Sequence, residues 1–377
     1  MYEDDYVALK KTSGEPPEKE KFTGRLIRHF AFGAVVIIAL VFGIWQYNQR
    51  SVRAAEERAV RNLSAISHQL FHDLMQVDDP EKISVAGLAR GSSRAYRRQM
   101  KALQDFNVPL EVENTFAGIR FRLVPAGSFI MGSSRNEPGR DSDENRHEVF
   151  IDEPFYCSKF EITQRQWRKV MGTHKSSFIE SGRNAPVENI SWRDIHSFID
   201  NLCRKSGVSN MTYRLLTEAQ WEYACRAGTH SPLYTGGISI HGHNNAPELD
   251  KIAWYAGNSG VQNEEDFYDS SEWPEKQFRH IRAATHPAGE KMPNAFGLYD
   301  MIGNVWEWCA DWYDDYSALS YISHPQGPAS GHYRVIRGGA WNSPACKCRS
   351  AGRDRSLPDF KDSCLGFRII RIIHPAT

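Results

Sequence analysis

Seven cysteines are the residues of this 377-residue sequence with the most distinctive chemistry. All lie between Cys157 and Cys364, and their spacings do not form the paired Cys-x-x-Cys units of a zinc site. In an oxidising compartment they allow up to three disulfides with one thiol left over. The alternative is that they are buried free thiols, which pack as small apolar side chains.

Cys346 and Cys348 form a Cys-x-Cys pair, which makes them the candidate catalytic thiols of the chain. Soft thiolate ligands suit a soft metal such as copper, so the pair could bind one by itself. The competing interpretation is that both cysteines are structural. No Gly-x-Ser-x-Gly motif and no phosphate-binding loop occurs in the sequence, so hydrolase and nucleotide chemistry receive no support.

Four histidines stand in two pairs. His68 and His72 are four residues apart in a predicted helix, and one helix face can hold two metal ligands at that spacing. No further ligand accompanies them, which favours an ordinary polar face. His241 and His243 lie in a loop rich in Gly and Asn and are predicted to be at the surface.

Composition bounds the class of protein. The sequence has 46 basic and 46 acidic residues, so no overall field favours nucleic acid as a partner. Aromatic residues make up 12% of the chain and include ten Trp, which predicts a buried core. The length predicts one large or two medium domains with accessory segments.

Residues 29–49 contain no Asp, Glu, Lys or Arg. A helix of this length, at about 1.5 Å per residue, spans the roughly 30 Å hydrocarbon layer of a membrane. Trp45 and Tyr47 lie at one end, where aromatic rings prefer the interface. A buried core helix is the alternative, but no face of the segment is polar. No small-x-small cleavage site follows, which predicts an uncleaved signal-anchor.

The cations that flank this span set its predicted orientation. More of them precede it than follow it, which places the tail, residues 1–28, in the cytoplasm. The cysteine-bearing part is then extracytoplasmic, and periplasmic if the source is bacterial, where disulfides persist. The cations are Lys10, Lys11, Lys19, Lys21, Arg25 and Arg28 before the span, and Arg50, Arg53, Arg58 and Arg61 after it.

Residues 50–115 are predicted to form a helical stalk, because apolar residues recur there at three- and four-residue steps. Pro80 separates a first helix from a second one over about 81–106. One part of the second helix is basic: Arg94, Arg97, Arg98 and Lys101. That part is either a solvated face, a surface packed against the next domain, or a contact with lipid headgroups or a partner.

From residue 116 the sequence turns to short strands, predicted at 119–124 and 128–131, separated by turn residues. Helices are predicted to start at Thr163, Ser191 and Thr217, with Asp194 placed for a capping box. No repeat of 20–50 residues occurs. This pattern predicts an α+β domain with much irregular backbone.

Seven segments of this region resemble, in order, those of the formylglycine-generating enzyme (sulfatase-modifying factor) family. The most specific contains Gly303-Asn-Val-Trp-Glu-Trp308. The resemblance implies a C-type-lectin-like α+β fold over residues 116–373. The segments are 124–132, 154–164, 185–192, 213–223, 293–309, 335–341 and 365–368.

The resemblance also implies a structural calcium ion in the loop that contains this motif. Its ligands would be the side chains of Asp300 and Glu307 and the carbonyls of Gly303 and Val305. Hard oxygen donors from one tight loop suit calcium. The alternative is a loop held by hydrogen bonds alone. A second family calcium site, near Asn258, is not carried over, because an insertion at about 260–282 interrupts it.

Enzymes of this family oxidise a substrate cysteine to formylglycine with two cysteines that bind copper and activate oxygen. The first position falls on Ser343, four residues after Gly339. The second falls on Cys348 by count, or near Ala345 if about three residues are deleted, as a downstream family segment indicates. The two-thiol site is therefore not carried over, and copper is not expected. Loop proximity in the family further implies the disulfide candidates Cys309–Cys348 and Cys225–Cys364, although sequence cannot establish connectivity.

Two functions follow from the resemblance. The first is a membrane-anchored, extracytoplasmic binding or scaffold protein whose domain is not catalytic and whose partners are the membrane and other envelope proteins. The second is a metal- and oxygen-dependent oxidase acting on protein cysteine through Cys346 and Cys348 or a His-rich loop. A sensor that relays a signal through the single helix is a third class, on which the sequence is silent.

Overall fold

A computed structural model describes residues 92–209, 212–316 and 321–373, and all of them belong to one unit, 83–377. The predicted tail and membrane span, and the first part of the stalk with His68 and His72, lie outside the described residues. Within the described ranges, no helix combines the length and the apolar character needed to cross a membrane.

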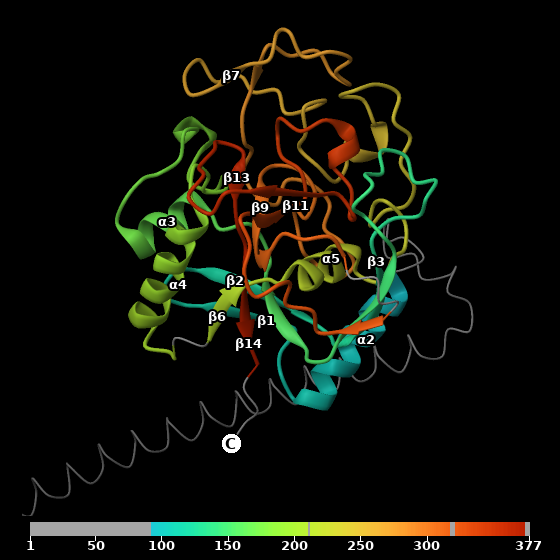
Figure 1. Ribbon diagram of the computed structural model, residues 1–377. Coiled ribbons are helices and arrows are strands. Elements are labelled where there is room, and N and C mark those ends of the chain that lie inside the picture. The colour runs from blue at the N-terminus through green and yellow to red at the C-terminus, as the bar shows by residue number, and fades with distance from the viewer. Residues whose placement is uncertain (1–91, 210–211, 317–320, 374–377) are drawn as a thin grey trace, which may run out of the picture. The chain divides into compact units, whose positions relative to one another are not determined.

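A five-stranded antiparallel sheet ties the two ends of the domain together (Figure 1). The last strand lies between strands from much earlier in the chain, so residues 369–372 complete the sheet instead of extending its edge. In β2, the inward-facing residues are buried while Arg120 is exposed, which is the alternation expected of a half-buried strand. The order is β1 (Glu111–Asn114), β2 (Ile119–Val124), β5 (Phe155–Ser158), β14 (Ile369–Ile372) and β6 (Tyr213–Leu215).

Three smaller sheets make up the rest of the β structure. A four-stranded sheet has the order β12 (Arg353–Ser356), β11 (Arg334–Arg337), β9 (Trp306–Trp312) and β13 (Leu365–Gly366). A three-stranded sheet has the order β10 (Tyr321–Ser323), β4 (His147–Ile151) and β3 (Gly127–Met131). The pair β7 (Tyr268–Asp269) and β8 (Arg282–Ala283) lies in the insertion, which forms the loops at the top of Figure 1.

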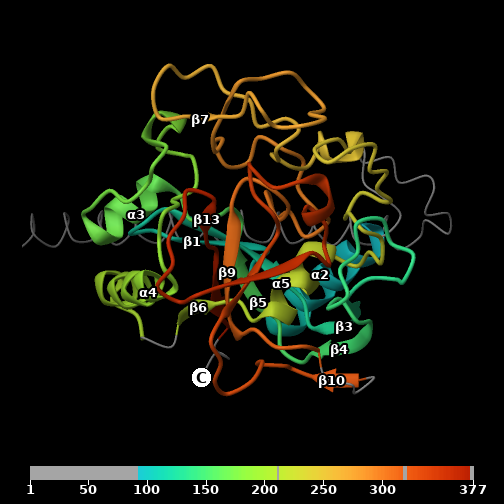
Figure 2. The same ribbon diagram turned by 45° about the horizontal axis from the view of Figure 1, so that its top comes forward.

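Three helices begin at the predicted caps. Thr163, Ser191 and Thr217 each accept a hydrogen bond from the backbone N–H three residues on, and each start is a full capping box. The helices are α3 (Gln164–Met171), α4 (Trp192–Ser206) and α5 (Glu218–Arg226), with short 3₁₀ turns η2 (Ile179–Ser181), η3 (Pro247–Leu249) and η4 (Ala345–Lys347). Every residue of α5 is buried, and Figure 2 shows this helix in the middle of the domain.

Helix α2 (Ser92–Phe106) changes the predicted domain boundary. Ala95 and Ala102 are buried, and Gln99 Nε2 donates to the carbonyls of Leu123 (2.5 Å) and Phe296 (3.1 Å). The end of the predicted stalk therefore packs on the domain through Ala95, Gln99 and Ala102, whereas Arg97 and Lys101 of its basic part are exposed. Because β1 also belongs to the large sheet, a boundary at 115/116 would cut through this unit.

Two apolar clusters form the core. One surrounds α5 and includes Phe129, Tyr223 and Phe296. The other lies around α4, where the Trp167 and Phe198 rings stack with centroids 5.4 Å apart. Aromatic side chains therefore pack against one another in the core, in stacked and tilted pairs of this kind.

Candidate functional site

Paired charges surround the start of α5. Glu222 forms salt bridges with Arg226 (2.7 Å) and Arg337, and Glu218 forms them with Arg337 (3.2 Å) and Arg353 (2.9 Å). All five side chains are buried. Each carboxylate here faces at least one guanidinium, which is the arrangement that makes buried charge tolerable.

A second paired set holds the 133–144 loop. Arg349 donates to Glu144 (2.6 Å) and Glu137 (2.7 Å), and all three residues are buried. Asp141, Asp143 and Glu144 are a group of acidic side chains close enough together to hold a metal ion. Lys347 lies 2.7 Å from Asp141, and Arg349 pairs with Glu144. Two of the three carboxylates therefore already form salt bridges within the chain.

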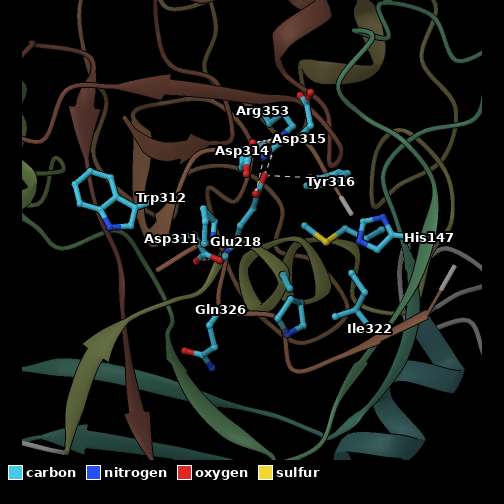
Figure 3. A pocket seen from close by; sticks show the side chains of 15 residues that line it. His147, Glu218, Asp311, Trp312, Asp314, Asp315, Tyr316, Ile322, Gln326 and Arg353 are labelled. Carbon is cyan, nitrogen blue, oxygen red and sulfur yellow. Dashed lines mark hydrogen bonds and ion pairs between the residues drawn. The ribbon is translucent and has the colours of Figure 1, made fainter. Parts of the chain in front are cut away.

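A pocket of about 380 Å³ lies beside Glu218, where β9 and β10 end (Figure 3). Asp311 and Trp312 line one side of it, and His147 and Ile322 lie on the opposite side. Sequence reasoning did not find this pocket, because its walls come from separate elements. The remaining lining residues are Met131, Glu218, Ala219, Asp314, Asp315, Tyr316, Pro325, Gln326, Gly327, Pro328 and Arg353.

Asp311 differs from the paired carboxylates. It is only 4% exposed, and its Oδ2 accepts the backbone N–H of Glu218 at 2.8 Å. Burial, followed by the charge of Glu218, raises its pKa to about 7. Arg334, whose charge lowers the pKa of Asp311, lies over the rings of Trp192 (3.8 Å) and Trp312 (3.4 Å). Among the described residues, no salt bridge reaches Asp311.

The predicted calcium loop is buried and tightly folded. Asp300, Asn304 and Gly303 all have positive φ, at 52°, 60° and 82°. Asp300 Oδ2 accepts the N–H of Gly289 at 2.7 Å, and Glu307 binds Arg368 at 2.7 Å. Three of the four predicted ligands therefore lie in one turn, and Glu307 lies in strand β9, which follows it. The carboxylate of Glu307 is already paired with the guanidinium of Arg368.

A third carboxylate, Glu161, joins this loop and was missed as a site residue. Its oxygens accept from Val305 N (3.1 Å) and Asn304 Nδ2 (2.8 Å). Burial, then the charges of Asp300 and Glu307, raises the pKa of Glu161 well above its ordinary value. Burial likewise raises the pKa of Asp300 to about 6. In the sequence, the only indication that Glu161 belongs to this site was its position in segment 154–164, one of the segments that carry the resemblance.

This loop therefore holds three buried carboxylates around one buried guanidinium, that of Arg368. The excess negative charge and the oxygen-only donor set fit a hard divalent cation. Glu307 would have to share its carboxylate between the cation and Arg368.

The positions predicted for the family's oxidase thiols are Ser343 and either Cys348 or Ala345. The Ser343 hydroxyl accepts the N–H of Ala340 at 2.9 Å, and Ala345 is fully buried. Cys348 is also buried, and burial raises the pKa of its thiol. Cys346 is half-buried, with its Cβ against Gly139. Because a buried protonated thiol is a poor nucleophile and metal ligand, Cys348 lacks the environment of a reactive thiol.

The two predicted disulfides are not formed, since all seven cysteines are free thiols in the structure. Cys225 belongs to the cluster around α5, where its Sγ lies 3.6 Å from Ser350 Oγ, whereas Cys364 packs against the other cluster. Cys309 and Cys348 lie in one cluster but remain separate thiols. Neither pair predicted from family loop proximity is bonded in the structure.

The loop histidines are exposed as predicted. The backbone N–H of His241 donates to Asn245 O (2.9 Å), and the backbone N–H of His243 donates to Glu275 Oε2 (2.5 Å). Neither ring belongs to a group of metal-ligating side chains among the residues that the structure describes.

Comparisons with known proteins agree with this geometry. Residues 111–373 match the family model of the sulfatase-modifying factor enzyme 1-like domain. The chain is 33% identical over 328 residues to the formylglycine-generating enzyme of Mus musculus, covering 74% of this chain and 82% of that protein. It is 33% identical over 260 residues to the chaperone protein LppX of Paenibacillus barcinonensis, covering 61% of this chain and 81% of that protein.

Two solved structures have a similar fold. Treponema denticola variable protein 1 aligns with a TM-score of 0.55 at 27% identity, covering 70% of this chain and 99% of that one. PvdO from Pseudomonas aeruginosa aligns with a TM-score of 0.52 at 27% identity, covering 70% and 98%. The chain therefore belongs to the sulfatase-modifying factor family, whose fold class is the α+β arrangement described above.

Proposed function

We propose that this chain is a binding or scaffold member of the family, not an oxidase. The observation that supports the proposal is the mismatch at the predicted oxidase positions, where Ser343 stands at the first and either Cys348 or Ala345 at the second. Ser343 is used in a local turn and Cys348 is buried, so neighbouring residues do not restore a second thiolate. The name of the LppX relative, a chaperone, supports a role that acts on other proteins without oxidising them.

The test is an oxidation assay on the full-length chain loaded with copper(I). A cysteine-containing peptide is supplied, oxygen uptake is recorded, and mass spectrometry follows the aldehyde product. The expected result is uptake equal to that of copper with an unrelated protein, with no aldehyde. Aldehyde formation that disappears in a Cys346→Ser, Cys348→Ser double variant would establish the oxidase instead.

The proposal includes anchoring by residues 29–49, with the domain on the extracytoplasmic side and with the membrane and envelope proteins as partners. The uncharged length of that segment and the flanking cations support it. Protease added to cells whose outer envelope has been opened but whose inner membrane is intact should digest the domain while a cytoplasmic control protein survives. Protection of the domain, or its release by a salt wash, would contradict the anchor.

A structural calcium ion at Asp300, Gly303, Val305 and Glu307 is also part of the proposal. The excess buried negative charge of Glu161, Asp300 and Glu307 supports it. When bound, the ion would supply positive charge and fix the backbone carbonyls of the loop. The expected result is calcium-dependent thermal stability that magnesium does not reproduce.

A further inference from the structure

We propose that the pocket beside Asp311 binds a guanidinium or ammonium group carried on a short apolar stem. This inference rests on the binding role proposed above and names the chemistry of what is bound. The pocket is not among the sites that the family resemblance implied.

The charge around Asp311 is the first observation. The carboxylate of Glu218 is already engaged by Arg353, Arg337 and the hydroxyl of Tyr316 (3.0 Å). Asp311 accepts a hydrogen bond from the backbone N–H of Glu218 at the start of α5. A helix N-terminus favours a negative group, but it does not carry a full positive charge. The charge of Arg334 favours the ionised form of Asp311, but burial outweighs it. A desolvated carboxylate is costly, and a further cation from solution would reduce that cost.

The acidic rim is a second observation. Asp314 and Asp315 are exposed where the pocket opens, and Arg353 is the one lining guanidinium among the described residues. Figure 3 shows Asp314, Asp315 and Arg353 gathered above Glu218. Exposed carboxylates at a cleft attract cations and raise their local concentration.

The remaining walls suit the stem of such a ligand. Met131, Ile322 and Pro325 supply apolar surface, and the volume of about 380 Å³ lies in the range of small-molecule sites. Two aromatic rings of the pocket contact arginine side chains of the chain itself. Arg353 lies 4.0 Å from the Tyr316 ring centroid, and Arg334 lies 3.4 Å from the Trp312 ring centroid. Guanidinium–ring contact is therefore an established mode in this part of the domain.

The cation could belong to an arginine side chain of a partner or to a free small molecule, and one titration separates these sources. Calorimetry of the full-length chain compares a terminally blocked Gly-Arg-Gly peptide, the same peptide with citrulline, and agmatine. Citrulline keeps the shape of arginine but has no charge. The arginine peptide should bind about tenfold or more tightly than the citrulline peptide, as expected for a hydrogen bond between charged groups.

Binding of agmatine but not of the peptide would identify a free small molecule, and binding of the peptide but not of agmatine a presented side chain. Equal affinity for arginine and citrulline peptides, or no binding of any probe, would overturn the proposal. Asp311→Asn should abolish the preference for arginine, whereas Asp359→Asn, at an exposed ion pair that does not line the pocket, should not.

The pH dependence of binding gives a test that needs no variant at Asp311. Its pKa of about 7 means that the site loses its charge in acid, while the arginine peptide stays cationic. Affinity should fall about 30-fold between pH 8.5 and pH 5.5. Glu218 and Arg334 face Asp311 from α5 and β11, and His147, Asp314, Asp315, Tyr316 and Arg353 also line the pocket.

Because His147 is also a titratable group of the pocket, a His147→Gln variant should keep the same profile. A flat profile in the unmodified chain would contradict the assignment to Asp311. Failure of this pocket to bind cations leaves the oxidation assay unaffected, so the two proposals fail separately.

Discussion

Two groups of buried carboxylates in this domain differ in their counter-charges. Glu218 and Glu222 face three guanidinium groups, and Glu144 shares Arg349 with Glu137. The calcium loop, in contrast, sets three carboxylates against Arg368, and Asp311 has no cation paired with it among the described residues. The first group is complete within the chain. The second group is where we propose that an added cation binds.

The largest expected effect comes from breaking a complete set. Arg349→Met leaves Glu144 buried without its partner, and we expect a loss of about 3–5 kcal/mol in the free energy of unfolding. Denaturant unfolding measures it. Arg193→Met is the matched control, because its ion pair with Asp359 is mostly exposed and should contribute less than about 1 kcal/mol. Similar losses in both variants would show that the buried set does no more than a surface pair.

Completing the calcium loop should have the next largest effect. Calcium at a hundred times its dissociation constant should add about 2.7 kcal/mol to the free energy of unfolding. Asp300→Ala should remove this response because it deletes a side-chain ligand. Identical stabilisation of the variant by calcium would mean that the calcium binds elsewhere. If calcium does not stabilise the unmodified chain, Arg368 alone balances the charge of the three carboxylates.

Asp311→Asn removes the unpaired charge itself. The folded pKa of Asp311 is raised from 3.8 to about 7, so the folded state binds the extra proton between these values. The free energy of unfolding should therefore fall as pH rises through this window and stay level above it. At pH 8 the variant should be about 1–3 kcal/mol more stable than the unmodified chain. This advantage should shrink as pH falls and vanish at about pH 3, where the unfolded chain also protonates this group.

Glu188, whose pKa is also raised to about 7, should leave a remaining slope in the Asp311→Asn variant. A variant that is less stable at both pH values would mean that the contact with the start of α5 outweighs the buried charge.

The smallest expected effect concerns the cysteines. A reducing agent should leave the thermal midpoint unchanged, because the thiols are free. A disulfide between Cys309 and Cys348, or between Cys225 and Cys364, would typically contribute about 2–4 kcal/mol. A clear drop in the midpoint on reduction would therefore reinstate one of these pairs.

Local signals in the sequence predicted the local structure well. Thr163, Ser191 and Thr217 start the three helices because a hydroxyl at that position satisfies an otherwise free N–H, a requirement that involves only neighbouring residues. The predicted strands 119–124 and 128–131 correspond to β2 and β3, since alternation and turn residues are equally local. The ordered family segments extended this to the fold class.

Features that depend on distant residues could not be predicted in the same way. The amphipathic pattern of α2 does not say what its apolar face contacts, and only the structure joins Gln99 to Leu123 and Phe296. Glu161 reaches the calcium loop from 144 residues away, as measured to Val305. Asp311 belongs to the family-like strand β9, but its lack of a salt bridge depends on where Arg334 lies.

Carboxyl carbon NMR of Asp311 in the full-length chain tests the distinction between paired and unpaired charge most directly. Titration is followed with and without the blocked Gly-Arg-Gly peptide. The expected midpoint is near 7 for the free chain and moves to lower pH when the peptide is present. A midpoint near the ordinary aspartate value of about 4 in both titrations would contradict the account.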